Sequence, residues 1–232
     1  MADFFQTGAI ATLHRLGPPD AARIEEELCA FAQKAPIALV LPCHARELGS
    51  PALERIVGEL RGAKFLRQIV VGVDGADTAA KWNRARKIFS VLPQDTVLVW
   101  NDGPRIRRLL RRLAGSATRG ASAGKGRNVW LCTGAVLALG RARVIAMHDC
   151  DIANYSRAML ARLCWPVANP APGFDFCKGY YARVSDRMHG RVTRLLVAPL
   201  LRALREIAGP NPLVEHLASF RYPLARSEEH TS

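Results

Sequence analysis

The sequence predicts an α/β domain whose mostly parallel sheet is flanked by helices, and three observations support this. Apolar runs of strand length alternate with helix-length segments across residues 36–147, and this alternation is typical of βαβ units. Polar residues that include acids follow several of these runs, as they do where parallel sheets bind ligands beyond the carboxyl ends of their strands. With 232 residues, 49% of them hydrophobic, the chain is long enough to bury one such core.

The first three elements follow from apolar spacing and from prolines. A helix is expected over residues 21–35, because apolar residues recur at helical spacing after an N-cap-like Pro-Pro-Asp sequence. Residues 36–42, an apolar run bounded by prolines, predict a buried strand. Residues 51–62 place their apolar side chains on one side of a second helix. The chain therefore opens with a helix, a strand and a helix.

The middle of the chain repeats this alternation. Apolar runs predict buried strands at residues 66–73 and 96–100. Helices are expected at residues 78–89 and 104–113, and the second of these is rich in arginine. Strands separated by helices of this length pair in parallel, because each crossover returns the chain to the same edge of the sheet.

The remaining elements surround a segment of small residues. Glycine, serine and alanine dominate residues 115–126, which predicts a loop. An apolar helix is expected at residues 129–139 and a short buried strand at 144–147. Beyond that strand the pattern is weaker, with a strand expected at residues 174–184 and a helix with one apolar face at 192–208.

Charge and cysteine usage narrow the function classes. The formal net charge of +13 favours an anionic partner, which includes nucleic acid, phosphorylated small molecules and anionic membrane surfaces. The arginines are spread through most helices without a recognition-helix pattern, so nucleic acid is not the expected partner. The six cysteines form no C-x-x-C pair, which argues against structural zinc and for a reducing, cytoplasmic location. We expect no secretory signal and no membrane span.

The last seven residues, 226–232, do not continue the apolar pattern before them. They match the translation of a sequencing adapter, so we expect a non-native tail and a natural sequence interrupted near Ala225. A natural polar tail is the alternative.

The segment Asp149-Cys150-Asp151 follows the expected strand at residues 144–147 after one intervening residue, His148. Two carboxylates at positions i and i+2 of an extended segment point to the same side, and they repel each other unless a cation lies between them. A hard divalent ion, Mg²⁺ or Mn²⁺, is the usual solution. The alternative is a solvated turn in which Asp151 caps the next helix.

Two other strand ends carry polar residues of the same kind. Residues 44–47 follow the first expected strand and residues 74–77 follow the second. Because the carboxyl ends of parallel strands meet at one edge of the sheet, these residues and the two aspartates are expected to lie together.

Several segments carry a resemblance to a known family. Residues 124–130 include a Gly-Lys-Gly followed by a tryptophan, residues 149–151 form the Asp-x-Asp, and residues 190–193 read Gly-Arg-Val-Thr. Together with residues 41–47, 74–78, 178–181 and 199–201, they resemble the glucosyl-3-phosphoglycerate synthases, which are retaining glycosyltransferases of the GT-A type.

The resemblance implies a GT-A-type, Rossmann-like fold with a nucleotide-sugar-binding half at residues 1–152 and an incomplete, helix-rich acceptor-binding half at 153–225. It implies a metal-dependent, homodimeric enzyme that transfers glucose from a nucleotide-glucose to the 2-hydroxyl of 3-phosphoglycerate, with retention. Ala45 and Arg46 stand where the family has an asparagine and an acid. The family's chain also continues past Ala225 and supplies a histidine to the metal site.

Three residues carry the chemistry that the resemblance implies. Asp151 is expected to hold Mg²⁺ or Mn²⁺ and to act in catalysis, and Asp149 to contact the ribose, the metal or its water. Lys125 is expected to reach the base or diphosphate of the donor, because the glycines on both sides allow close backbone approach. Its alternative is a solvated loop lysine.

The nucleoside is expected near Pro42, Glu47 and Asp74. Glu47 would bind ribose or base, or it is an acid in the first turn of a helix. Asp74 would accept a hydrogen bond from the base, or it caps the helix that begins near Thr78.

The acceptor phosphate is expected at a helix start, where backbone N–H groups and a guanidinium form a seat for an anion. The residues implied are Lys178, Gly190, Arg191, Val192 and Thr193. The alternatives are helix-start residues without a ligand and an exposed strand lysine.

Other functions remain open at this point. Mannosyl transfer, a glycerate or lipid acceptor, and nucleic-acid binding are the alternatives, and the basic surface also allows weak membrane-surface contact. No residue is an obvious nucleophile for a double displacement, so we expect a front-face mechanism that depends on positioning and electrostatics.

Overall fold

A computed structural model describes residues 20–114, 124–171, 174–179 and 198–208 of the chain. Residues 19–179 form one compact unit, and residues 1–18 and 180–232 form another. In the second unit, helix α7 (Ala198–Ala208) is the described element. The first unit contains the sheet. No helix in the described ranges has both the length and the apolar character needed to cross a bilayer.

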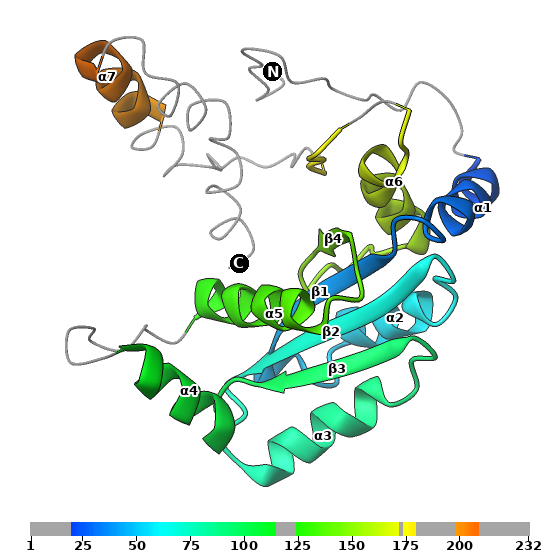
Figure 1. Ribbon diagram of the computed structural model, residues 1–232. Helices are drawn as coiled ribbons and strands as arrows, with labels where there is room; N and C mark the ends of the chain where they lie inside the picture. Colours follow the sequence, from blue (N-terminus) through cyan, green and yellow to red (C-terminus); the bar gives the residue numbers. More distant parts are fainter. Residues whose placement is uncertain (1–19, 115–123, 172–173, 180–197, 209–232) are drawn as a thin grey trace, which may run out of the picture. The chain divides into compact units, whose positions relative to one another are not determined.

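The sheet has four parallel strands, as the sequence predicts. They are β1 (Ile37–His44), β2 (Leu66–Asp74), β3 (Asp95–Trp100) and β4 (Val144–Met147), in the spatial order β3-β2-β1-β4. The pairing brings His44 opposite Asp74, Val73 opposite Trp100, and Val40 opposite Met147. The carboxyl ends of all four strands therefore lie along one edge of the sheet (Figure 1).

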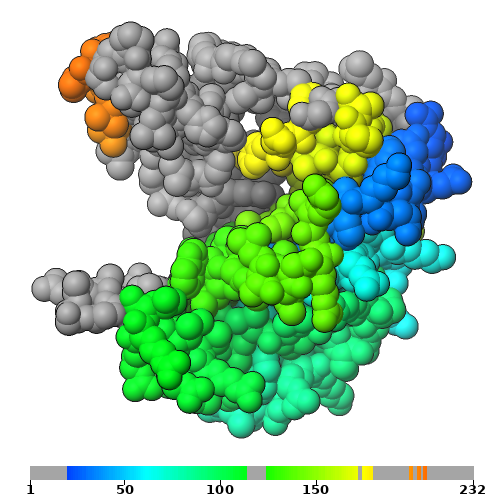
Figure 2. All heavy atoms as spheres, viewed as in Figure 1, coloured from blue at the N-terminus to red at the C-terminus, as the bar shows by residue number. Residues whose placement is uncertain are grey.

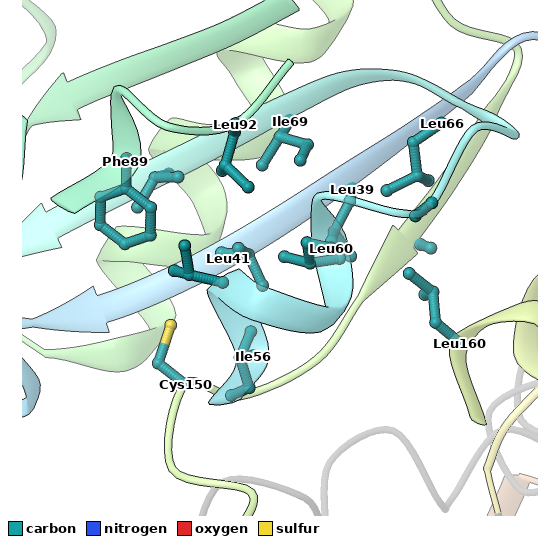
Figure 3. Close-up of a cluster of buried hydrophobic side chains, with 14 of the residues drawn as sticks. Leu39, Leu41, Ile56, Leu60, Leu66, Ile69, Phe89, Leu92, Cys150 and Leu160 are labelled. Atoms are coloured by element: carbon teal, nitrogen blue, oxygen red, sulfur yellow. The ribbon is translucent and has the colours of Figure 1, made fainter. Parts of the chain in front are cut away.

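Helices cover both faces of this sheet (Figure 1). Helices α1 (Ala21–Phe31), α2 (Pro51–Leu60), α3 (Ala79–Phe89) and α6 (Arg157–Ala168) lie on one face, and their apolar side chains form one buried cluster with alternate residues of the strands. Leu39 and Leu41 of β1 and Ile69 of β2 are among its members (Figure 3).

Helices α4 (Pro104–Ala114) and α5 (Lys125–Leu139) cover the opposite face. The smaller cluster there combines Ala38, Val40 and Val70 of the strands with Leu131 and Val136 of α5. The strand residues of this cluster alternate with those of the first one, as the two-residue repeat of a strand requires. In the space-filling view, α4 and α5 form neighbouring parts of one surface (Figure 2).

The helices begin where the sequence provides caps. The side chains of Asp20, Ser50 and Thr78 accept hydrogen bonds from the backbone at the starts of α1, α2 and α3, which satisfies N–H groups that have no partner inside the helix. Helix α5 ends at Gly140, whose φ of 62° is the left-handed conformation favoured by glycine.

Two expectations about the elements are wrong, and one helix was not expected. Lys125 and Gly126, expected in a loop, belong to the first turn of α5. Helix α6 was not expected, because it contains Pro166 and lacks a clear apolar stripe. Residues 174–179, expected in a strand, are irregular, and they add no strand to the sheet. The part of the expected helix at residues 192–197 lies outside the described residues.

Candidate functional site

The Asp149-Cys150-Asp151 segment leaves the sheet at the carboxyl end of β4. Cys150 is 3% exposed and belongs to the larger apolar cluster, and its thiol points into that cluster beside Leu41 and Ile56 (Figure 3). A hydrogen bond with Cys43, near the end of β1, and burial raise the pKa of the Cys150 thiol. Because Cys150 anchors the segment in the core, its two neighbouring carboxylates are held at the strand edge.

A buried hydrogen-bonded histidine supports the same segment. His148 Nδ1 lies 3.0 Å from the carbonyl oxygen of Asp149, and its Nε2 lies 3.0 Å from the hydroxyl of Tyr155. A carbonyl only accepts, so Nδ1 carries the proton and, in the neutral ring, the tyrosine hydroxyl donates to Nε2. Arg55 of α2 donates to the carbonyl oxygen of Tyr155 at 2.9 Å. These bonds connect the segment to α2.

Helix α5 presents its first residue to this segment. The ammonium of Lys125 lies 2.7 Å from Oδ1 of Asp149, whose side chain is 12% exposed. The sequence predicted both residues at one site, and the structure brings them into direct contact. The ammonium therefore offsets the charge of one of the two carboxylates of the Asp-x-Asp segment.

A second cation on α5 joins two other strand ends. Arg127 forms ion pairs with Asp74 at the end of β2, at 2.8 Å, and with Asp102, which follows β3, at 3.5 Å. All three side chains are largely buried. Asp74 therefore pairs with a side chain of α5 and does not cap α3, whose cap is Thr78.

The start of α5 lies close to the sheet because Gly72 of β2 has no side chain. Asn128 donates from Nδ2 to the carbonyl oxygen of Gly72 at 2.9 Å, and Cys132 donates to Oδ1 of Asn128 at 3.4 Å. A Cβ on Gly72 would collide with both of these side chains. This close approach fixes the position of Lys125 and Arg127 relative to the strand ends.

The end of β1 contributes two of the predicted residues. Pro42 is buried inside β1, which continues to His44 rather than ending at the proline. Glu47 lies in the short 3₁₀ helix Ala45–Glu47 and accepts a hydrogen bond from Arg46 at 3.0 Å. The Glu47 side chain is thus close to the strand edge, next to the position where Arg46 replaces the family's acid.

Several buried polar atoms at this edge have no hydrogen-bond partner among the described residues, whereas Oε1 of Gln68 and of Gln94 are such atoms elsewhere. Those at this edge are both amide atoms of Asn101, Oδ2 of Asp102, Nε of Arg127 and Oδ1 of Asp151. Buried polar groups normally have partners, so several such atoms at one place are typical of a ligand site. Among Asp74, Asp102, Asp149, Asp151, Lys125 and Arg127, the carboxylates outnumber the cations, which suits a divalent cation.

The metal ligands are few in the described part of the chain. No group of three or more histidine, cysteine, aspartate or glutamate side chains is placed there to hold an ion. The buried Oδ1 of Asp151 nevertheless fits a metal, because it has no hydrogen-bond donor among the described residues.

The acceptor residues are less well described. Lys178 lies in the irregular residues 174–179 and is half-buried. Gly190, Arg191, Val192 and Thr193 lie outside the described residues, so the phosphate seat stays a prediction.

Sequence reasoning missed Asn101, Asp102 and Arg127 as site residues. Asn101 and Asp102 directly follow the strand that ends at Trp100, which is the signal that identified the other carboxylates. Arg127 was recognised only as part of the Gly-Lys-Gly segment, because its two partners lie 53 residues and 25 residues away in the sequence.

The chain is similar to two curated proteins named glucosyl-3-phosphoglycerate synthase. The protein from Persephonella marina is 43% identical over 225 residues, which cover 97% of this chain and 56% of the relative. The protein from Methanococcoides burtonii is 33% identical over 234 residues, covering 99% of this chain and 56% of the relative. The chain thus spans about half the length of the curated relatives it matches.

A crystal structure of mannosyl-3-phosphoglycerate synthase from Rubrobacter xylanophilus matches with a TM-score of 0.50 and 22% identity, covering 90% of this chain and 55% of that one. This likeness concerns the fold, which is of the GT-A glycosyltransferase type. No protein-family model matches the chain. The chain is thus similar, along nearly its whole length, to two curated proteins named glucosyl-3-phosphoglycerate synthase, and its fold is that of the GT-A glycosyltransferases.

Proposed function

We propose that the protein is a hexosyltransferase that moves glucose from a nucleotide-glucose donor to the 2-hydroxyl of 3-phosphoglycerate. The observation that carries this proposal is the 2.7 Å contact between Lys125 and Asp149, two residues before Asp151, whose Oδ1 is buried. Carboxylates for a divalent ion beside a cation for phosphate are the groups that a nucleoside diphosphate needs. The relatives named glucosyl-3-phosphoglycerate synthase support the choice of sugar and acceptor.

Departure of a nucleoside diphosphate builds negative charge on its β-phosphate, and this site supplies positive charge there. Lys125, at the N-terminal end of α5, reaches the diphosphate when it exchanges Asp149 for a phosphate oxygen, and the helix start adds N–H groups of the same polarity. Asp151, with Asp149, would hold Mg²⁺ or Mn²⁺, and the bound ion would supply Lewis-acid stabilisation of the leaving phosphate.

The nucleoside occupies the carboxyl ends of β1 and β2. Asp74 accepts a hydrogen bond from the base, and Glu47 binds the ribose or the base beside Pro42. The burial of Asp74 supports this assignment, because a carboxylate that is shielded from water binds an N–H donor more strongly than an exposed one does.

The acceptor phosphate binds Arg191 and Thr193, with Gly190, Val192 and Lys178 nearby. These positions follow from the family resemblance. Transfer proceeds with retention and without a covalent intermediate, since the described residues around the two aspartates provide carboxylates for a metal rather than a separate nucleophile. Trapping of a glycosyl-enzyme would contradict this part of the proposal.

The transfer reaction is tested by incubating the protein with a panel of nucleotide sugars, 3-phosphoglycerate and Mg²⁺ or Mn²⁺, with product detection by mass spectrometry. We expect Asp151→Asn to lower turnover by about 100-fold or more, because it removes the charge that holds the ion. Asp77→Asn is the matched control, since Asp77 is an exposed acid of the same edge that pairs with Lys81. Equal turnover of the wild type and Asp151→Asn would contradict the proposed metal site. Transfer of mannose in place of glucose would contradict the proposed sugar.

A further inference from the structure

Arg127 engages one oxygen of a carboxylate in the proposed nucleoside site. Its guanidinium lies 2.8 Å from Oδ1 of Asp74. We propose that Arg127 determines the donor base by leaving a single oxygen of Asp74, Oδ2, to accept from the ligand, which selects uracil over guanine. This inference rests on the proposed function, in which Asp74 faces the base.

The arginine is held in place by a second carboxylate and by its helix. Asp102 lies 3.5 Å from the same nitrogen of Arg127, and the exposed fractions of the Arg127, Asp74 and Asp102 side chains are 12%, 10% and 17%. The next residue, Asn128, is bonded to β2. A guanidinium confined between two shielded carboxylates loses little freedom when a ligand binds, so Asp74 is preorganised.

Base chemistry explains why one remaining oxygen matters. Uracil presents one imide N–H between two carbonyl groups, whereas guanine presents an N–H and an NH₂ group side by side, which together need both oxygens of a carboxylate. Guanine at this place would leave one donor buried without a partner, and that is costly. Adenine has no imide N–H and would direct a ring nitrogen lone pair at the carboxylate.

Asn101 lies near Asp74 in the sheet. Its backbone N–H donates to the carbonyl oxygen of Val73 at 3.1 Å, so it adjoins the residue before Asp74. The side chain is 1% exposed, and neither of its amide atoms has a partner among the described residues. An amide N–H₂ suits the carbonyl that flanks the imide of uracil.

The experiment measures dissociation constants by isothermal titration calorimetry. The probes are UDP, GDP, ADP and N3-methyl-UDP in Mg²⁺, and the proteins are the wild type, Arg127→Met and Arg127→Lys. Arg141→Met is the matched control, because Arg141 also pairs with an aspartate, Asp95, but at the other end of β3. Thermal melting of each variant tests whether it is folded.

We expect the wild type to bind UDP about tenfold or more tightly than GDP and than N3-methyl-UDP, as a site built for one N–H donor should. In Arg127→Met, the second oxygen of Asp74 is released, so UDP binds more weakly and its preference over GDP falls to about threefold or less. The preference of Arg127→Lys for UDP over GDP is expected to lie between these two values. Arg141→Met is expected to keep the preference of the wild type.

Two results would overturn the inference. One is a wild type that does not prefer UDP over GDP. The other is a ratio of GDP to UDP dissociation constants that stays unchanged in every folded Arg127 variant. If Arg127→Met does not fold, the ratio in Arg127→Lys decides the question. These outcomes differ from failure of the proposed function, which is read from glucose transfer to 3-phosphoglycerate and holds with either base.

Discussion

At the residue scale, the two aspartates of the Asp-x-Asp segment are not equivalent. Asp149 holds the ammonium of Lys125 at 2.7 Å, whereas the buried Oδ1 of Asp151 has no hydrogen-bond donor in the described ranges. Cys150 between them is fixed in the core. Because a metal binds most readily where a carboxylate has no competing cation, Asp151 is the better ligand of the two.

Cys132 of α5 makes folding stability depend on alkaline pH. Burial raises the pKa of its thiol from 9.0 to about 12. The unfolded chain therefore loses this proton first, so the stabilising effect is complete below pH 9 and is lost as pH rises from 9 towards 12. We expect the free energy of unfolding to fall by about 1.4 kcal/mol per pH unit more in the wild type than in Cys132→Ala over that range.

Urea unfolding of both proteins at pH 8, 9.5 and 10.5 measures this difference. Cys132→Ala has a smaller side chain, but its packing loss is the same at every pH, so the comparison isolates the thiol. Parallel pH dependence of the two proteins would show that the thiol does not contribute.

Individual residues also show which parts of the site the sequence can predict. Asp149, Asp74 and Lys125 were predicted at one edge of the sheet; in the structure Asp149 contacts Lys125, and Asp74 contacts Arg127 of α5. Arg127 was missed because its role depends on pairing between segments that are distant in sequence. Asp102 was missed although it follows a strand end, because an acid before a glycine is also typical of an ordinary turn.

At the element scale, Gly72 of β2 controls how closely α5 approaches the sheet. Gly72→Ala would force Asn128 and Cys132 away from the strand, and we expect a loss of about 1–3 kcal/mol in the free energy of unfolding together with weaker nucleotide binding. Gly58→Ala in α2 is the matched control. A Cβ there meets nothing within 4 Å, so it should stabilise by about 0.5–1 kcal/mol.

Chemical denaturation and UDP titration of both variants provide the measurements. Equal stability of Gly72→Ala and the wild type would mean that α5 is free to move without cost, contrary to the packing described.

Some of the helices and strands could be predicted from the sequence, whereas the start of α5 could not. All four strands were predicted, because each contains a run of consecutive apolar residues, as buried parallel strands do. The helix was predicted to begin at residue 129, after its true start at Lys125, because Gly124, Lys125 and Gly126 are individually poor evidence for a helix. Contact of α5 with β1, β2 and β3 overrides this local preference.

At the scale of the whole molecule, part of the net charge of +13 is carried by exposed arginine side chains on α4. Arg105, Arg108 and Arg112 are exposed on this helix, whereas Ile106 packs against the core. We expect only weak, sequence-independent binding of DNA or RNA, with an affinity that falls steeply between 50 and about 200 mM salt. UDP binding should change far less over the same range, because it depends on buried pairs.

Fluorescence anisotropy with labelled oligonucleotides, beside UDP titrations in the same buffers, tests this contrast. Sequence-specific binding that persists at high salt would favour the nucleic-acid alternative. The homodimer implied by the family resemblance is a separate prediction, which light scattering tests.

The contact between Lys125 and Asp149 has a thermodynamic consequence. A divalent ion that binds alone must compete with the ammonium for Asp149, whereas a diphosphate offers Lys125 a new anion and releases the carboxylate. Titrations of Mg²⁺ with and without UDP, and of UDP with and without Mg²⁺, should therefore give the same ratio of affinities, since linkage is reciprocal. Lys125→Met should reduce that ratio towards one. The ion pair thus makes the metal and the nucleotide bind cooperatively, each increasing the affinity for the other.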